Sequence, residues 1–210
     1  MIPFRTQTPS RRPVPTKNPG GENWGEHKSD LKEDFNSCCG YCDSYDGFKH
    51  TYFEVDHFVP KSFFKNGGNI SLTQYDNLVY SCKFCNNAKR AKWPSRKEKV
   101  FNDGNEGFVD PCDTEYDTHF YRTNDGGIMW ITILGKWMFS EAFKFDERQQ
   151  GIKILWNLSQ LKRIINVLAV VLNTYPDDNY DYKQIKIKIG DYCFEYFKYH
   201  QELIMYYDSN

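Results

Sequence analysis

The sequence has almost no net charge, no hydrophobic stretch long enough to cross a bilayer, and no secretory signal. Its 27 Lys and Arg residues nearly balance 28 Asp and Glu residues, for a net charge of −1, so total charge indicates no nucleic-acid or membrane partner. The most apolar stretch, Ile164 to Leu172, includes Asn166 and falls short of the roughly 20 residues that a membrane helix needs. After Met1 the chain runs into polar, Pro-rich sequence, unlike a signal peptide. We therefore expect a cytoplasmic protein that does not bind membranes.

Internal repeats are also missing, and the composition is that of a globular protein. Hydrophobic residues make up 40% of the chain and aromatic residues 17%, enough to build a core. Residues 1–28 hold several prolines and a Gly pair and predict an extended arm, either disordered or laid along a partner. We expect the chemistry in a domain over residues 29–112. A hairpin and a helical C-terminal lobe are expected over 113–210.

Local patterns predict the elements of these regions. Ser29 is a good N-cap for a short helix through Phe35. Strands are predicted at 51–55 and 77–81, and a helix at 83–93 that Pro94 ends. A hairpin is predicted from 119–122 and 128–134, then helices at 146–156 and 159–173, the second capped by Ser159. The tail is ambiguous, because 185–189 alternates like a strand while 192–206 fits a helix.

Seven cysteines are present, and four of them form two C-x-x-C pairs: Cys39 with Cys42 and Cys82 with Cys85. In a chain without a secretory signal this pattern favours metal binding over disulfides. Four thiolates can bind one Zn²⁺ tetrahedrally and leave no open position, so the zinc would be structural. A redox pair and ordinary core cysteines are the alternatives. Cys38 lacks the right spacing to replace Cys39, and we expect Cys112 and Cys193 to be buried thiols.

Residues 43–81 separate the cysteine pairs and contain Asp56-His57 followed by Pro60, then Asn77-Leu78; Asn86 and Lys89 follow Cys85. A lone His near a strand is usually a core residue. The combination of these motifs, however, closely resembles the HNH endonuclease family over about 55 residues. Asp56, His57 and the two Asn residues also have the spacing of the HNH domain of CRISPR effector nucleases. That resemblance implies an α+β fold with a ββα-metal core. The zinc bound by the four paired cysteines would stabilise this core.

The resemblance also implies a role for each residue. His57 matches the general base, since a neutral imidazole can take a proton from water near pH 7. Asp56 and Asn86 match the ligands of a catalytic Mg²⁺ or Mn²⁺ ion, which prefers oxygen donors. Asn77 matches the Asn that braces the loop around the site, although an Asx-turn role is also open. Adjacent side chains on a strand face opposite sides, so Asp56 and His57 can meet only if the strand ends or twists there.

A basic segment from Lys83 to Lys99 holds seven Lys or Arg residues and a single acidic residue. Such runs are often merely solvated. Here the run begins on the helix of Asn86, and Lys89 and Arg90 lie three and four residues further on, on the same face. We therefore predict that Lys89, Arg90 and Lys92 bind substrate phosphates.

The predicted function is that of a metal-dependent HNH endonuclease acting on nucleic acid, with duplex DNA as the expected substrate. Phe108-Val109-Asp110-Pro111 and the hairpin after it resemble HNH subunits of Septu and retron-associated anti-phage systems, which implies a defence role. The N-terminal arm is a candidate tether to an ATPase partner. Two alternatives stay open: a nuclease for RNA such as tRNA, and a zinc-stapled nucleic-acid-binding module without catalysis. A zinc deaminase is excluded, because it needs His-x-Glu and a Pro before the cysteine pair, where Ser81 stands.

Overall fold

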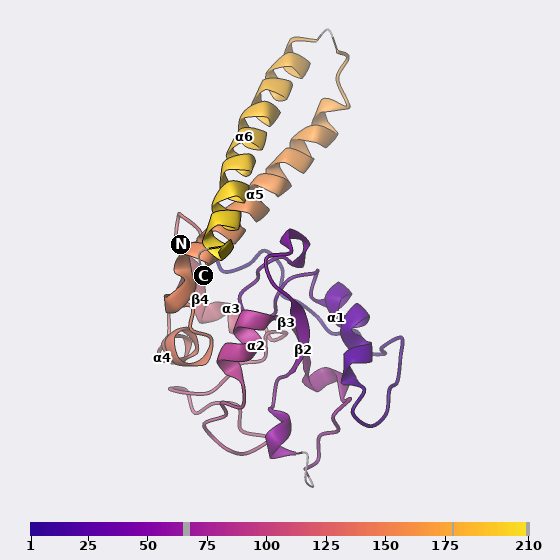
Figure 1. Ribbon diagram of the computed structural model, residues 1–210, viewed down its shortest axis with the longest axis vertical. Helices are drawn as coiled ribbons and strands as arrows, with labels where there is room; N and C mark the ends of the chain where they lie inside the picture. The colour runs from indigo at the N-terminus through magenta and orange to yellow at the C-terminus, as the bar shows by residue number, and fades with distance from the viewer. Residues whose placement is uncertain (65–67, 178, 209–210) are drawn as a thin grey trace. The chain divides into compact units, whose positions relative to one another are not determined.

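A computed structural model describes residues 1–64, 68–177 and 179–208 (Figure 1). The chain divides into two compact units, Met1–Gln149 and a second that begins at Gln150. The hairpin after residue 112, which sequence patterns group with the C-terminal helices, therefore belongs to the first unit. The fold is mixed α+β, with one two-stranded and one three-stranded antiparallel sheet.

The first unit contains a ββα motif at its centre. Strands β2 (Phe53–His57) and β3 (Leu78–Cys82) pair antiparallel, with Asp56 opposite Val79 and His57 opposite Leu78. Helix α2 (Lys83–Lys89) follows β3 without a break. The helix ends at Arg90, which has a positive φ of 48°, well before Pro94. The predicted order of two strands and a helix is confirmed, with a shorter helix than expected.

The N-terminal arm packs on its own chain. Strand β1 (Ile2–Pro3) pairs with β4 (Phe120–Arg122), which pairs in turn with β5 (Ile128–Trp130). Phe4 is buried, and the Arg5 guanidinium donates to the carbonyls of Gly40 and Pro111. The prediction of a free or partner-bound arm is therefore wrong for its first residues, because their apolar and cationic groups find partners within the chain.

The remaining short elements surround these two sheets. Helices α1 (Lys28–Asp34), α3 (Glu115–Thr118) and α4 (Ile133–Trp137) lie in the first unit. The N-cap of α1 is His27, without a side-chain cap, so Ser29 does not cap it. Short 3₁₀ helices cover Trp24–His27, Asp46–Phe48, Lys61–Phe63, Tyr75–Asn77 and Asp146–Arg148, and Met138–Ala142 forms a π-helical turn.

The second unit consists of two long helices, α5 (Gln149–Leu172) and α6 (Tyr180–Asp208). One continuous helix replaces the two that were predicted over 146–173, so Ser159 is a helix-interior residue and not a cap. The ambiguous tail is helical throughout. Cys193 on α6 is exposed and Cys112 is only half-buried, so the expectation that both are buried is wrong.

By length and composition alone, one segment of the described residues could cross a membrane. Asp146–Leu172 has a mean hydropathy of 1.2, and 17% of its apolar window is buried. The apolar run that we judged too short is thus part of a longer apolar helix. A single such helix is weak evidence of a membrane span.

Candidate active site and metal cluster

The four paired cysteines converge. The sulfurs of Cys39, Cys42, Cys82 and Cys85 all lie within 4.8 Å of one another, and all four residues are buried. The sulfurs of Cys42 and Cys82 are 3.8 Å apart, close to the edge of a tetrahedron with Zn–S bonds of about 2.3 Å. Cys38 is not in the group. The donor set fits a zinc ion, and it joins the turn before β2 to the end of β3 and the first turn of α2.

Arg148, which the sequence patterns did not single out, lies against this cluster. Its Nη2 donates to Cys85 Sγ at 2.8 Å, and its guanidinium lies over the rings of Phe84 and Phe145. Desolvation would lower the pKa of Arg148, but the four sulfurs raise it well above its usual value, Cys85 most. Arg148 therefore supplies positive charge beside a group of thiolates whose complex with zinc is anionic.

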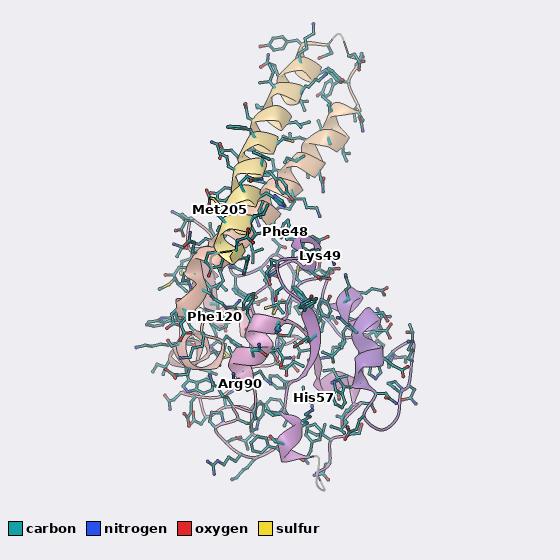
Figure 2. The ribbon with its side chains drawn as sticks, viewed as in Figure 1. Phe48, Lys49, His57, Arg90, Phe120 and Met205 are labelled. Atoms are coloured by element: carbon teal, nitrogen blue, oxygen red, sulfur yellow. The ribbon has the colours of Figure 1, made fainter. Side chains whose placement is uncertain are left out.

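A pocket of about 410 Å³ opens beside the end of β2. Its lining brings together three of the predicted catalytic residues, Asp56, His57 and Asn86, with Arg90 from the end of α2. His57 and Arg90 come from neighbouring elements of the ββα motif (Figure 2). Strand β2 ends at His57, which lets two adjacent side chains reach the same pocket.

His57 is held in one orientation. Its Nε2 lies 2.9 Å from the carbonyl oxygen of Leu72, and because a carbonyl only accepts, Nε2 must carry the hydrogen in the neutral ring. The other nitrogen, Nδ1, then has the lone pair that a base needs. Burial lowers the pKa of His57 below its ordinary value, against the opposing effects of the Leu72 carbonyl and Asp56. The lowered pKa favours the neutral ring near pH 7, which is the form that a general base requires.

Asp56 forms a buried network with a tyrosine and a lysine. Tyr41 donates its hydroxyl to Asp56 Oδ2 at 2.6 Å, and the Lys89 ammonium lies 3.0 Å from the same oxygen. Lys89 is completely buried and also donates to the carbonyl of His57 at 2.8 Å. Among the described residues, no hydrogen bond involves Asp56 Oδ1, the oxygen that can therefore serve as a ligand.

Asn86 is oriented by Glu54, two residues before Asp56 on β2. The amide Nδ2 of Asn86 donates to Glu54 Oε2 at 2.7 Å. Alternate residues of a strand share a face, and α2 packs on the face that carries Glu54 and Asp56. With its nitrogen engaged, Asn86 has its amide oxygen left to offer. Asp56 and Asn86 thus present one carboxylate and one amide oxygen, a donor set that fits a hard divalent ion.

Asn77 braces the loop after His57. Its Oδ1 accepts from the backbone nitrogen of Val59 at 2.9 Å, and its Nδ2 donates to the carbonyl of the same residue at 3.2 Å. Asn77 does not line the pocket. The contact agrees with the bracing role, since the amide holds the segment between His57 and Pro60 against the start of β3.

The structure places the three predicted phosphate-binding residues in different environments. Arg90 is exposed and lines the pocket. Lys89 cannot bind substrate as predicted, because its ammonium is buried and paired with Asp56. Lys92 is not part of the pocket lining and donates to the carbonyl of Glu141. A shared helix face did place Lys89 beside Asn86, but that face points into the core.

Two pocket residues were missed by sequence reasoning. The ring centroids of Trp24 and His57 are 5.0 Å apart in an edge-to-face arrangement, and the ammonium of Lys61 lies over the Trp24 ring, 4.7 Å from its centroid. Trp24 comes from the N-terminal arm, and no local pattern connects it with residue 57. Lys61 follows the motif directly, so a count of basic residues near His57 could have found it.

Comparisons with known proteins agree with this geometry. Residues 39–92 match the model of the HNH endonuclease family. A Septu protein PtuB from Bacillus thuringiensis is 35% identical over 85 residues, 40% of this chain and 31% of the relative. A Septu protein PtuB from Bacillus mycoides (strain KBAB4) is 27% identical over 207 residues, 80% of this chain and 67% of the relative. The chain thus covers less than a third of the first relative and about two thirds of the second. No solved structure shows a significant match.

Proposed function

We propose that this protein hydrolyses phosphodiester bonds of nucleic acid, because residues 39–92 match the HNH endonuclease family model. His57 is the general base, and Asp56 and Asn86 hold one divalent ion, Mg²⁺ or Mn²⁺. The observation that supports this is the pocket, which gathers His57, Asp56 and Asn86. The substrate is DNA, duplex DNA by preference, and the setting is anti-phage defence, as the two Septu relatives suggest.

The chemistry starts with water in the pocket. His57 Nδ1 takes one proton from the water, whose oxygen attacks the phosphorus as the bond to the 3′ oxygen breaks. The departing 3′ oxygen gains a proton from solvent, which leaves 5′-phosphate and 3′-hydroxyl ends. A divalent ion bound to Asp56 and Asn86 supplies charge that offsets the phosphate and the leaving oxygen. Arg90 and Lys61 bind neighbouring phosphates.

The side chains around these groups fix them in place. The carbonyl of Leu72 sets the His57 tautomer. Glu54 accepts from the Asn86 amide nitrogen and leaves the amide oxygen available, and the Lys89 ammonium forms an ion pair with Asp56. Asn77 keeps the loop behind His57 in position. Such support is what keeps a catalytic group within the narrow range of productive geometry.

Nuclease assays test this proposal. Purified protein is incubated with plasmid DNA, single-stranded DNA and total RNA including tRNA, each with Mg²⁺, with Mn²⁺ and with EDTA. We expect metal-dependent cleavage of plasmid DNA, which His57→Ala lowers by roughly 10²–10⁴-fold. Asn86→Ala should lower it comparably, while Asn87→Ala, at the exposed neighbouring position, should not.

Three outcomes would count against the proposal. Cleavage that His57→Ala does not lower would reject His57 as the base. RNA cleavage without DNA cleavage would reject the substrate. DNA binding without cleavage under any divalent ion, in the presence of the proteins encoded beside this one, would identify a binding module.

A further inference from the structure

Helix α6 carries two apolar stripes on opposite sides. The less exposed stripe is spaced alternately by three and four residues, the 3.5-residue period of a coiled coil: Tyr182, Ile185, Ile189, Tyr192, Tyr196, Tyr199, Leu203 and Tyr206. Near the start of α5 and the end of α6, Tyr206 of this stripe packs against Gly151 of α5. This inner stripe is the side on which α6 meets α5.

The second stripe, the outer seam, consists of Ile187, Phe194, Phe197 and Ile204. These four side chains are 58%, 60%, 57% and 44% exposed. At about 100° per residue they fall within an arc of roughly 100°, on the side of α6 away from the inner stripe. Met205, 62% exposed, lies at the edge of the same arc. A soluble chain rarely exposes two Phe and two Ile side chains in one line, so the outer seam is a candidate interface.

The spacing of the outer seam reads the same in both directions, since its steps are seven, three and seven residues. Two copies of α6 laid antiparallel would therefore place Ile187 level with Ile204 of the second copy. Phe194 would lie level with Phe197. The same register sets Gly190, where an added Cβ would meet open space, opposite Gln201. A two-fold interface requires such self-complementarity, whereas a different partner would impose no symmetry on this chain.

The charges follow the same symmetry. Lys183 and Asp208 lie on the same face, one at each end of the outer seam, and the antiparallel register sets each opposite the other in the second copy. Within the described part of the chain, neither residue makes an ion pair. Asp191 and Lys198 flank the seam. In the same register, Asp191 of one copy lies within two residues of the position opposite Lys198 of the second copy. Unlike charges thus meet at both ends of the interface.

From this we propose that two copies of the chain associate through the outer seams of α6, antiparallel and related by a two-fold axis. The interface buries the two Phe residues at its centre and places Lys183–Asp208 pairs at its ends. The dimer carries two HNH domains in one particle. The proposal rests on α6 alone and does not depend on nuclease activity.

Sedimentation and light scattering of the 210-residue, zinc-loaded chain test it. We expect a dimer of twice 24.9 kDa with a dissociation constant on the order of micromolar. A phosphine reductant is included because exposed Cys193 could form disulfide dimers. Phe194→Glu with Phe197→Glu should give a monomer of unchanged helix content. Val167→Glu, at an exposed position of α5, should leave the dimer intact.

A charge swap provides the second measurement. Lys183→Asp and Asp208→Lys should each weaken the dimer roughly tenfold, since each puts like charges opposite one another, and together they should restore it. A wild-type monomer at about 100 times the expected dissociation constant would overturn the proposal. So would a dimer that persists in the double Phe variant, or a charge swap that fails to restore association.

Discussion

Lys89 and Asp56 form a buried ion pair directly behind the pocket. Replacing Lys89 with Met keeps most of the side-chain volume but leaves the Asp56 carboxylate buried with Tyr41 as its remaining partner. The carbonyl of His57 also loses its donor. Because an unpaired buried charge is costly, we expect Lys89→Met to lower the free energy of unfolding by about 3 kcal/mol. Guanidinium denaturation with zinc bound and no other divalent ion added measures this.

The matched control for this variant is Lys83→Met. Lys83 lies on the same helix but is exposed, with its ammonium 6.0 Å from the Tyr52 ring. Its replacement should change stability by less than about 0.5 kcal/mol. Equal effects of the two substitutions would show that Lys89 is not the buried partner of Asp56.

We expect His119 to make the stability of the first unit depend on pH. Burial lowers its pKa below the ordinary value, and its Nδ1 lies 2.5 Å from the Thr132 hydroxyl. The folded state therefore keeps the ring neutral, while the unfolded chain takes up a proton near pH 6.5. The stability that the neutral His119 ring contributes is fully present above about pH 6.5. It falls as the pH drops from there toward the lowered pKa of His119.

Thermal unfolding at two pH values isolates this effect. Between about pH 7.5 and pH 5.5 the melting temperature of the parent should fall more than that of His119→Gln, by roughly 2 °C. Other titrating groups and any loss of zinc affect both proteins and cancel in the difference. A drop of equal size in both would rule out His119 as a source of the pH dependence.

At the level of elements, the cysteine cluster joins the segment before β2 to the β3–α2 junction, and Cys38 beside it offers an internal control. We expect Cys39→Ser to lose its zinc and several kcal/mol of folding free energy, as structural zinc sites do. Cys38→Ser should keep one zinc per chain, because Cys38 lies outside the sulfur group. Elemental analysis with thermal unfolding measures both. Zinc retained by Cys39→Ser and lost by Cys38→Ser would reverse the assignment of the ligand.

The ββα elements could be predicted because their signals are local. Thr51 to Val55 is rich in strand-forming residues, and the C-x-x-C spacing distinguishes Cys39 from Cys38 without any structure. The sequence did not predict that α5 is one continuous helix. Ser159 looks like a cap in sequence, yet a Ser inside a long apolar helix costs little, and only the packing of its neighbours decides between the two.

The site residues divide in the same way. The motif predicts His57, Asp56, Asn77 and Asn86, since each lies at a characteristic spacing, and the structure brings Asp56, His57 and Asn86 to one pocket. The motif could not give Trp24 or Arg148, which reach the pocket and the cysteines from distant parts of the chain. The prediction that Lys89 binds substrate was wrong for a related reason. The sequence shows which residues share a helix face, but not that this face turns Lys89 toward buried Asp56 and Tyr41.

At the scale of the whole molecule, the N-terminal arm is part of the first unit and helps to support the candidate site. Arg5 joins the turn of the first cysteine pair to the segment after Asp110, and Arg11 donates to the carbonyl of Leu78, which pairs with His57. The same arm then carries Trp24 into the pocket. A change near the start of the chain should therefore alter the candidate site, although no residue before Trp24 lines its pocket.

Phe4→Ala tests this coupling. Phe4 is buried against Tyr116 and Phe120, so its truncation should cost about 3–5 kcal/mol of folding free energy. Val14→Ala, at a position 77% exposed, should cost less than about 0.5 kcal/mol. Hydrogen exchange should show faster exchange in β1 and β4 and also in the segment that holds Trp24, since the arm is anchored at Phe4. If exchange near Trp24 is unchanged in Phe4→Ala, the two ends of the arm are held independently.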